Sequence, residues 1–174
     1  EFAIYGVDFH QRGSITDETI EVLHKLWSGA MVEHHGVHFD FPRVQLSPAP
    51  AIHPPIYIGG SSEVALRRAA RMGDGYIGAG TAPEAVTLLL RRLHELRQEY
   101  DREHLPFDAM LGITAAPSLD LYRRLADDGL QSTVAPPFQY ALGKKHSTID
   151  EKKRCMEAYA EGIGHAGHKC WTGV

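Results

Sequence analysis

The residues best suited to binding chemistry form one short turn, Gly59-Gly60-Ser61-Ser62. The turn follows a short apolar run and precedes a segment with helical periodicity. Two glycines let a backbone approach a ligand closely, and the free N–H groups of a helix N-terminus attract anions. With two serine hydroxyls, and with Arg67 and Arg68 one turn further on, the turn predicts a phosphate site. The structural alternative is a tight turn in which a serine only caps the helix.

A second turn, Ile77-Gly78-Ala79-Gly80, is rich in small residues and ends the next β-prone run. In parallel α/β folds the carboxyl ends of the strands share one edge of the sheet, and ligands bind there. We therefore expect the two turns to open on the same side, where small residues leave room for a flat group. A loop that only reverses the chain is the alternative for this turn taken alone.

Eleven histidines raise the question of a metal site. His34 and His38 are expected on one face of a hairpin, without a third ligand nearby. The motif His165-x-x-His168-x-Cys170 has a spacing found in zinc sites but lacks a fourth ligand. We therefore predict no metal site, and we interpret residues 164–174 as a flexible, glycine-rich tail.

The elements that position the two turns alternate regularly from residue 55 onward. Short apolar runs predict strands at 56–58, 76–79, 107–114 and 132–135. Helices are predicted between and after them, over Glu63–Met72, after a capping box at Thr81–Glu84, after Ser118 and after a second capping box at Thr148–Glu151. This alternation predicts an α/β fold with a parallel sheet. Both a doubly wound sheet and part of a (β/α)8 barrel fit, and a full barrel needs ~250 residues.

The remaining patterns concern the first third of the chain and one helix surface. Thr16 is expected to cap a helix that ends at Gly29, and residues 30–54 are expected to hold a small hairpin followed by a proline-rich stretch. On the long helix after residue 84, Arg91, Arg92 and Arg97 alternate with glutamates, which is typical of a solvated surface.

The composition is that of an ordinary globular protein of 174 residues, 43% hydrophobic and 23% charged. This length favours a single domain over residues 1–174. A formal net charge of −4 gives no electrostatic footprint for nucleic acid or an anionic membrane surface. No apolar run approaches the ~20 residues of a membrane helix, and no signal-peptide pattern opens the chain. With two cysteines only, we predict a cytoplasmic protein.

Taken together, these residues resemble the luciferase-like monooxygenase family. The run from Pro54 to Tyr76 is similar to the family signature P-P-I-x-x-G-G-S-S followed by R-R-A-A-R-x-G-D-G. Residues 1–13 are similar to the segment after the family's fourth strand, and residues 36–50 to its insertion before strand five. The resemblance covers residues 1 to about 160.

The resemblance implies a (β/α)8 TIM-barrel fold, of which this chain covers about strands five to eight, a half-barrel. Those strands would be residues 55–59, 75–79, 107–114 and 132–135. It also implies FMN, or alternatively the deazaflavin coenzyme, bound at the carboxyl ends of the strands. The phosphate would lie at the turn after strand five and the ring edge near the end of strand six. The implied cofactor-binding residues are Gly59, Gly60, Ser61, Ser62, Gly78 and Ala79.

The resemblance therefore predicts the C-terminal half of a flavin-dependent oxidoreductase or monooxygenase, which transfers hydride or oxygen to or from a small organic substrate. Strands one to four, which supply most catalytic side chains in the family, are absent, so no catalytic residue is assigned. A half-barrel leaves two open strand edges, so we expect a homodimer or pairing with a complementary half-barrel. A flavin reductase is a further expected partner. The alternative is a non-catalytic half-barrel that dimerises, with or without flavin.

Overall fold

The computed structural model of the protein describes residues 2–134, 142 and 147–161. The chain forms two compact units, Glu1–Ile56 and Tyr57–Val174. Compact units occur within single domains as well as between domains, so the single domain expected over residues 1–174 stays a prediction. The expected tail at residues 164–174, with its histidines and Cys170, lies outside the described residues.

The first unit contains one long helix and a hairpin. Its elements are η1 (Phe2–Tyr5), η2 (Phe9–Gln11), α1 (Arg12–Trp27), β1 (Val32–His35) and β2 (Asp40–Val44). β1 and β2 pair antiparallel, which confirms the hairpin. The prediction that Thr16 caps the helix was wrong, because the helix begins at Arg12 and the Thr16 hydroxyl donates to the Arg12 carbonyl at 2.7 Å. Asp8 caps the preceding η2 turn, and α1 continues from that turn.

Glu18 on α1 holds the hairpin through its carboxylate. The two oxygens accept the backbone N–H groups of Val37, His38 and Phe39 at 2.8–3.1 Å. They also accept His34 Nε2 at 3.0 Å. Burial opposes the charged form, but these hydrogen bonds outweigh it and lower the pKa of Glu18 to about 2. The carboxylate is therefore charged at neutral pH and fixes the turn between the two strands.

The second unit alternates strands and helices. Its elements are β3 (Tyr57–Gly59), α2 (Glu63–Met72), β4 (Gly75–Thr81), η3 (Pro83–Ala85), α3 (Val86–Glu99), β5 (Asp108–Ile113), α4 (Leu119–Asp127), β6 (Ser132–Val134) and α6 (Ile149–Tyr159). The strands form one sheet in the order β3-β4-β5-β6, and every neighbouring pair is parallel. The predicted parallel α/β fold is thus confirmed, and α2 has the predicted bounds.

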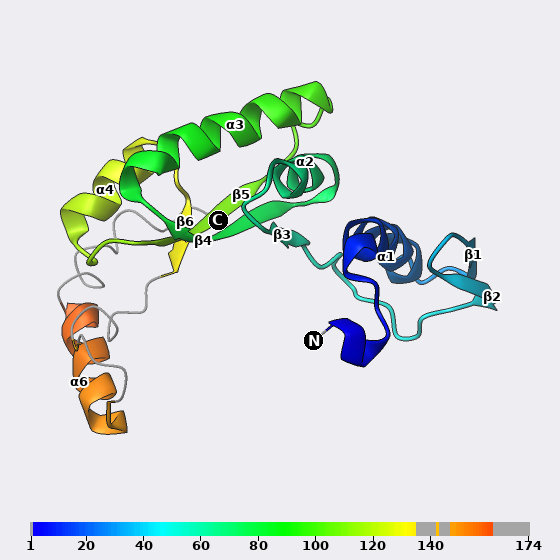
Figure 1. Cartoon of the computed structure of the whole chain (residues 1–174), viewed down its shortest axis with the longest axis horizontal. Coiled ribbons are helices and arrows are strands. Elements are labelled where there is room, and N and C mark those ends of the chain that lie inside the picture. The colour runs from blue at the N-terminus through cyan, green and yellow to red at the C-terminus, as the bar shows by residue number, and fades with distance from the viewer. Residues whose placement is uncertain (1, 135–141, 143–146, 162–174) are drawn as a thin grey trace. The chain divides into compact units, whose positions relative to one another are not determined.

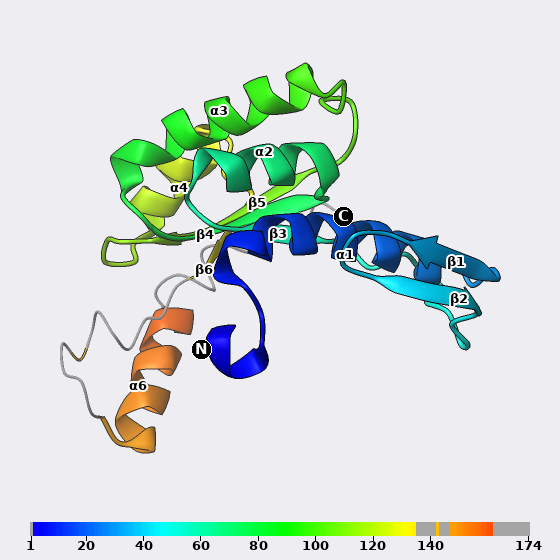
Figure 2. The same cartoon turned by 45° about the vertical axis from the view of Figure 1, so that its right-hand side comes forward.

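Helices α2, α3 and α4 all cover the same face of this sheet (Figures 1 and 2). The core lies between them, where Ile58, Tyr76, Ala109 and Leu111 are at most 7% exposed. A doubly wound sheet has helices on both faces and a reversal of strand order, whereas a barrel wall has neither. The described sheet, with these helices on one face (Figure 1) and its strands in chain order, therefore lacks both features of a doubly wound sheet. The described strands do not close into a barrel, and the half-barrel itself stays a prediction.

The other face of the sheet carries large side chains that are partly exposed. Tyr57, Ile77 and Val134 are 37%, 41% and 48% exposed. Strand register places all three on this face, opposite to the side chains that contact the helices. In a closed barrel this face would be the interior.

Two local predictions for the long helix were wrong. Thr81 does not cap α3, because it is the last residue of β4 and its carbonyl accepts the Thr114 N–H at 2.9 Å. The helix begins after the η3 turn, without a side-chain cap. Arg97 is not on a solvated surface. It is 4% exposed, stacks on the Phe107 ring at 4.3 Å and donates to the Leu105 carbonyl at 2.6 Å.

The predicted caps of the last two helices are confirmed. The Ser118 side chain accepts the Leu121 N–H, and Thr148 and Glu151 form a reciprocal capping box at the start of α6. The Tyr159 hydroxyl of α6 donates to the Tyr122 hydroxyl of α4 at 3.4 Å. Within the part of the chain that the structure describes, no helix is both long and apolar enough to cross a membrane.

Candidate functional site

A cavity of about 780 Å³ lies at the carboxyl ends of β3 and β4. Its volume is within the ~300–1,000 Å³ typical of small-molecule sites. Five of the six predicted cofactor-binding residues line it, namely Gly59, Gly60, Ser61, Gly78 and Ala79. Apolar side chains from α2 and α3, including Leu66, Leu88 and Leu89, form other walls. The turn after β3 therefore opens into the same cavity that residues 77–80 line. The prediction of a turn at residues 77–80 was wrong, because strand β4 continues through them to Thr81.

The turn after β3 depends on glycine. Gly60 has φ +113°, a conformation that L side chains rarely adopt. A Cβ there would also lie 2.9 Å from the Ala65 Cβ on the first turn of α2. Because Gly60 has no side chain, the turn can pack close to the N-terminus of α2. The exposed Gly60 also lines the cavity.

The two serines of this turn differ in role. Ser62 is the N-cap of α2, and its side chain accepts the Ala65 N–H at 3.3 Å. It does not line the cavity, so the capping alternative describes this serine. Ser61 is exposed and lines the cavity, so it is the serine of this turn that a ligand in the cavity can contact.

Arginines near the turn are balanced by carboxylates. Arg67 pairs with Glu63 at 3.1 Å and with Glu99 at 2.8 Å on the α2–α3 surface, and Arg67 does not line the cavity. Arg92, which the sequence pattern assigned to a solvated surface, lines the cavity and pairs with Glu63 and Glu95. The hydrogen bond from Arg92 lowers the pKa of Glu63.

Arg67 and Arg92 are both paired with glutamates. The feature of the turn that favours an anion is therefore the N-terminus of α2. Sequence reasoning missed Arg92 as a cavity residue. The only signal for it was its position about two helical turns into α3, and the packing of α2 beside α3 is what assigns that position to the cavity.

The amino ends of the strands carry a different kind of cluster. Asp108 begins β5, and its carboxylate accepts the Tyr57 hydroxyl at 2.9 Å and the Ser132 hydroxyl at 3.2 Å. The hydrogen bond to Asp108 is the main cause that raises the pKa of Tyr57, followed by burial. These bonds tie the first residues of β3, β5 and β6 together on the face opposite the helices.

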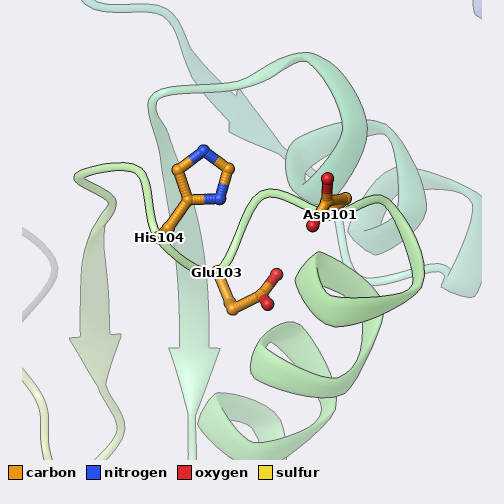
Figure 3. A group of neighbouring side chains, drawn as sticks. All are labelled: Asp101, Glu103 and His104. Carbon is orange, nitrogen blue, oxygen red and sulfur yellow. The ribbon is translucent and has the colours of Figure 1, made fainter.

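A group of titratable side chains lies on the connection from α3 to β5 (Figure 3). Possible ligand atoms of Asp101, Glu103 and His104 lie within 4.8 Å of one another, and all three residues are exposed. They sit at the end of the sheet away from the cavity. Exposed acidic groups of this kind are common without a metal, and no buried ligand joins them among the described residues.

The hairpin histidines are engaged in hydrogen bonds within the first unit. His34 is buried and donates from Nε2 to Glu18, while its Nδ1 lies 3.0 Å from Lys25 Nζ. His38 Nε2 lies 2.9 Å from the Ser14 hydroxyl. Because Glu18 accepts only and Lys25 donates only, His34 is held as the neutral Nε2–H tautomer. Both hairpin histidines thus have structural partners on helix α1.

The cavity fits a phosphate joined to a flat organic group. Gly60 and Ser61 provide backbone and a hydroxyl at a helix N-terminus, which suits a phosphate. Gly78 and Ala79 provide a wall without bulk, and the leucines provide apolar area. A flavin or deazaflavin combines a flat ring with a phosphate in its tail, so this donor set and shape are consistent with such a group.

Comparison with known proteins supports this interpretation of the fold. A family model for luciferase-like monooxygenases matches residues 1–161. The uncharacterised protein Rv0940c of Mycobacterium tuberculosis is 32% identical over 94% of this chain and 56% of its own length. An F420-dependent glucose-6-phosphate dehydrogenase of Nakamurella multipartita is 29% identical over 68% of this chain and 35% of its own length.

Solved structures of related enzymes share the fold. An F420-dependent secondary alcohol dehydrogenase, in complex with an F420-acetone adduct, superposes with a TM-score of 0.58 at 18% identity, over 95% of this chain and 57% of that chain. The monooxygenase RslO1 from Streptomyces bottropensis superposes with a TM-score of 0.54 at 18% identity, over 94% and 55%. The chain spans about half the length of these proteins. Its sequence match and fold show that it belongs to the luciferase-like monooxygenase family.

Proposed function

We propose that this chain is the C-terminal half of a luciferase-like barrel and binds a flavin-type cofactor in a flavin- or deazaflavin-dependent oxidoreductase. The observation that carries the proposal is the cavity at the carboxyl ends of β3 and β4, which is lined by both small-residue segments, residues 59–61 and residues 77–80. Its position agrees with the rule that ligands of parallel α/β barrels bind at this end.

Each part of the cavity has a distinct role in this proposal. The Gly60–Ser61 backbone and the Ser61 hydroxyl hold the phosphate, and Ser62 keeps the helix N-terminus formed. Gly59, Gly78 and Ala79 allow the ring edge to lie against the sheet. Leu66, Leu88 and Leu89 exclude water from one side of the ring.

FMN is the first candidate cofactor and the deazaflavin coenzyme is the alternative. Bound flavins of either kind supply hydride transfer, and FMN also supplies oxygen chemistry. Relatives include F420-dependent dehydrogenases, which favours the deazaflavin. A monooxygenase shares the fold, and oxygen chemistry is a reaction that FMN supplies. The reaction would act on a small organic substrate bound beside the ring.

The reaction requires an active site that is enclosed on more sides than the described sheet provides. The sheet face opposite the helices, which would be the interior of the barrel, is partly exposed at Tyr57, Ile77 and Val134. We expect a complementary half-barrel, or a second copy of this chain, to cover this face and supply the catalytic side chains. The edge strands β3 and β6 each have one free side in the described sheet, where further strands would pair.

The proposal is tested by titrating the 174-residue chain with FMN and following the quenching of flavin fluorescence. We expect saturable binding that Ser61→Asp abolishes, because the added carboxylate repels the phosphate. A matched control is Ser118→Asp, which adds the same charge at the N-cap of α4, where aspartate also caps well. This control should bind FMN as the unmodified chain does.

Two results would contradict the proposal. Equal affinity of the Ser61→Asp variant and the unmodified chain for FMN would show that the phosphate does not bind at this turn. Absence of any saturable binding by the unmodified chain, with both FMN and the deazaflavin coenzyme, would favour the alternative of a non-catalytic half-barrel that dimerises. Sedimentation analysis of the same sample would then show whether the chain forms a dimer.

A further inference from the structure

Tyr76 is a buried side chain that connects the core of the sheet to the turn after β3. It lies on β4, is 2% exposed and has its ring on the face that packs against the helices. Its hydroxyl donates to the Gly60 carbonyl at 3.0 Å. Burial raises the pKa of Tyr76, so the hydroxyl keeps its proton and remains a donor throughout the neutral range.

This hydrogen bond controls the direction of the next N–H group. A peptide unit is planar and trans, so the N–H of Ser61 points opposite to the carbonyl of Gly60. When Tyr76 holds the Gly60 carbonyl toward the sheet, the Ser61 N–H points away from the sheet. Gly60, at φ +113°, has no side chain to restrict rotation of this peptide, so the hydrogen bond from Tyr76 supplies the restraint.

Gly78 makes room for the tyrosine ring. It lies two residues further along β4, on the same face of the strand. A Cβ at Gly78 would lie 2.9 Å from Tyr76 Cε1 and 2.8 Å from Leu111 Cδ2. The ring therefore extends along the strand under Gly78 and reaches the carboxyl end of the sheet, although Tyr76 begins near the amino end.

We infer that Tyr76 is a positioning residue that sets the preference of the site for phosphorylated over unphosphorylated flavins, by holding the Gly60–Ser61 peptide in the phosphate-binding orientation. This inference rests on the proposed function, and it adds a selectivity role for a residue whose hydroxyl is turned toward the Gly60 carbonyl. The ring portion of a flavin would bind independently of this peptide, because it lies near Gly78 and Ala79.

The test is a two-by-two comparison of affinities. FMN and riboflavin share the same ring and differ by one phosphate, and Tyr76→Phe removes one hydroxyl and keeps the buried ring. Loss of a single hydrogen bond that positions a donor is expected to weaken FMN binding by roughly 3- to 10-fold. Riboflavin binding should stay within about twofold of the unmodified chain. Affinities would be measured by fluorescence quenching and repeated by calorimetry.

Tyr57→Phe is the matched control. It also removes one hydrogen-bonded hydroxyl from the same sheet, at the amino end, where Tyr57 donates to Asp108. It should leave the ratio of FMN to riboflavin affinity unchanged. Circular dichroism and a thermal melt of both variants establish that each is folded under the conditions of the titration.

The outcomes separate this inference from the proposed function. An unchanged FMN affinity in folded Tyr76→Phe, or an equal loss for FMN and riboflavin, overturns the positioning role and leaves the cavity as the flavin site. Failure of the unmodified chain to bind FMN overturns both. If Tyr76→Phe does not fold, Tyr76→Met is the second variant, because it also removes the hydroxyl and fills the space with a flexible apolar side chain. A selective loss of FMN binding would then support the inference, and an equal loss would overturn it.

Discussion

The two ends of the four-stranded sheet are built on different principles. At the carboxyl end, the turn after β3 and the last part of β4 consist mostly of glycine, alanine and serine, and they line the cavity. At the amino end, side chains hydrogen-bond to one another and to turn carbonyls, as Asp108 and Arg97 do. One end thus leaves backbone available to a ligand, and the other uses side chains to join neighbouring strands. The difference agrees with the general division of barrel folds into a ligand-binding end and a stabilising end.

The comparison predicts its largest effect at Gly60. Gly60→Val places a β-branched side chain at φ +113° and against Ala65, which should lower the free energy of unfolding by about 1–3 kcal/mol and weaken FMN binding more than tenfold. Gly129→Val is the control, because Gly129 has φ +97° after α4, at the amino end. Chemical denaturation and FMN titration of both variants would check this. A similar loss of affinity in both would break the distinction between the two ends.

A buried charge at the amino end should affect stability only. Arg97→Met keeps the stem that packs near Phe107 but leaves the carbonyls of Arg102 and Leu105 without their donor. We expect the free energy of unfolding to fall by about 2–4 kcal/mol, since two part-buried hydrogen bonds from a charged donor are lost. FMN affinity measured well below the melting temperature should not change. Weaker FMN binding by Arg97→Met, with an unchanged free energy of unfolding, would show that Arg97 acts at the ligand-binding end of the sheet.

The smallest effect is expected from the Tyr57–Asp108 pair at high pH. The pKa of Tyr57 is raised above its ordinary value of 10.0, so its contribution to stability is complete below pH 10 and is lost as pH rises through the raised pKa. Asp108→Asn should bring the tyrosine pKa back toward 10. The absorbance of tyrosinate, compared with that of Tyr57→Phe, would measure this. An unchanged titration of Tyr57 in Asp108→Asn would show that the carboxylate is not the cause.

Local sequence signals predicted most of the second unit, because its elements are short and sharply bounded. The bounds of α2 follow from the Ser62 cap, the apolar periodicity and Gly73, all within twelve residues. The two small-residue segments could be placed together in advance because parallel strands present their carboxyl ends at one edge, although the second segment is part of β4 and not a turn. Five residues of the candidate site were therefore predicted to lie near one another from topology alone.

The errors occurred where contacts distant in sequence outweigh a local signal. Thr81 matches a capping box, but its carbonyl is held by Thr114, which arrives from β5. Arg97 matches a solvated pattern, but it is buried beneath a turn that forms only when the chain reverses after α3. The hydrogen bond from Tyr76 to Gly60 is of the same kind, since it joins residues 16 apart and has no signature in either segment.

The central claim is that the carboxyl end of the sheet binds the flavin phosphate. Its most direct test is a titration of the isotopically labelled chain with FMN, followed by amide chemical shifts in two-dimensional NMR spectra. The amides of Gly60, Ser61, Gly78 and Ala79 should shift saturably and together, while those of residues 101–105 stay fixed. Shifts centred on residues 101–105, with the Gly60 and Ser61 amides unmoved, would contradict the account.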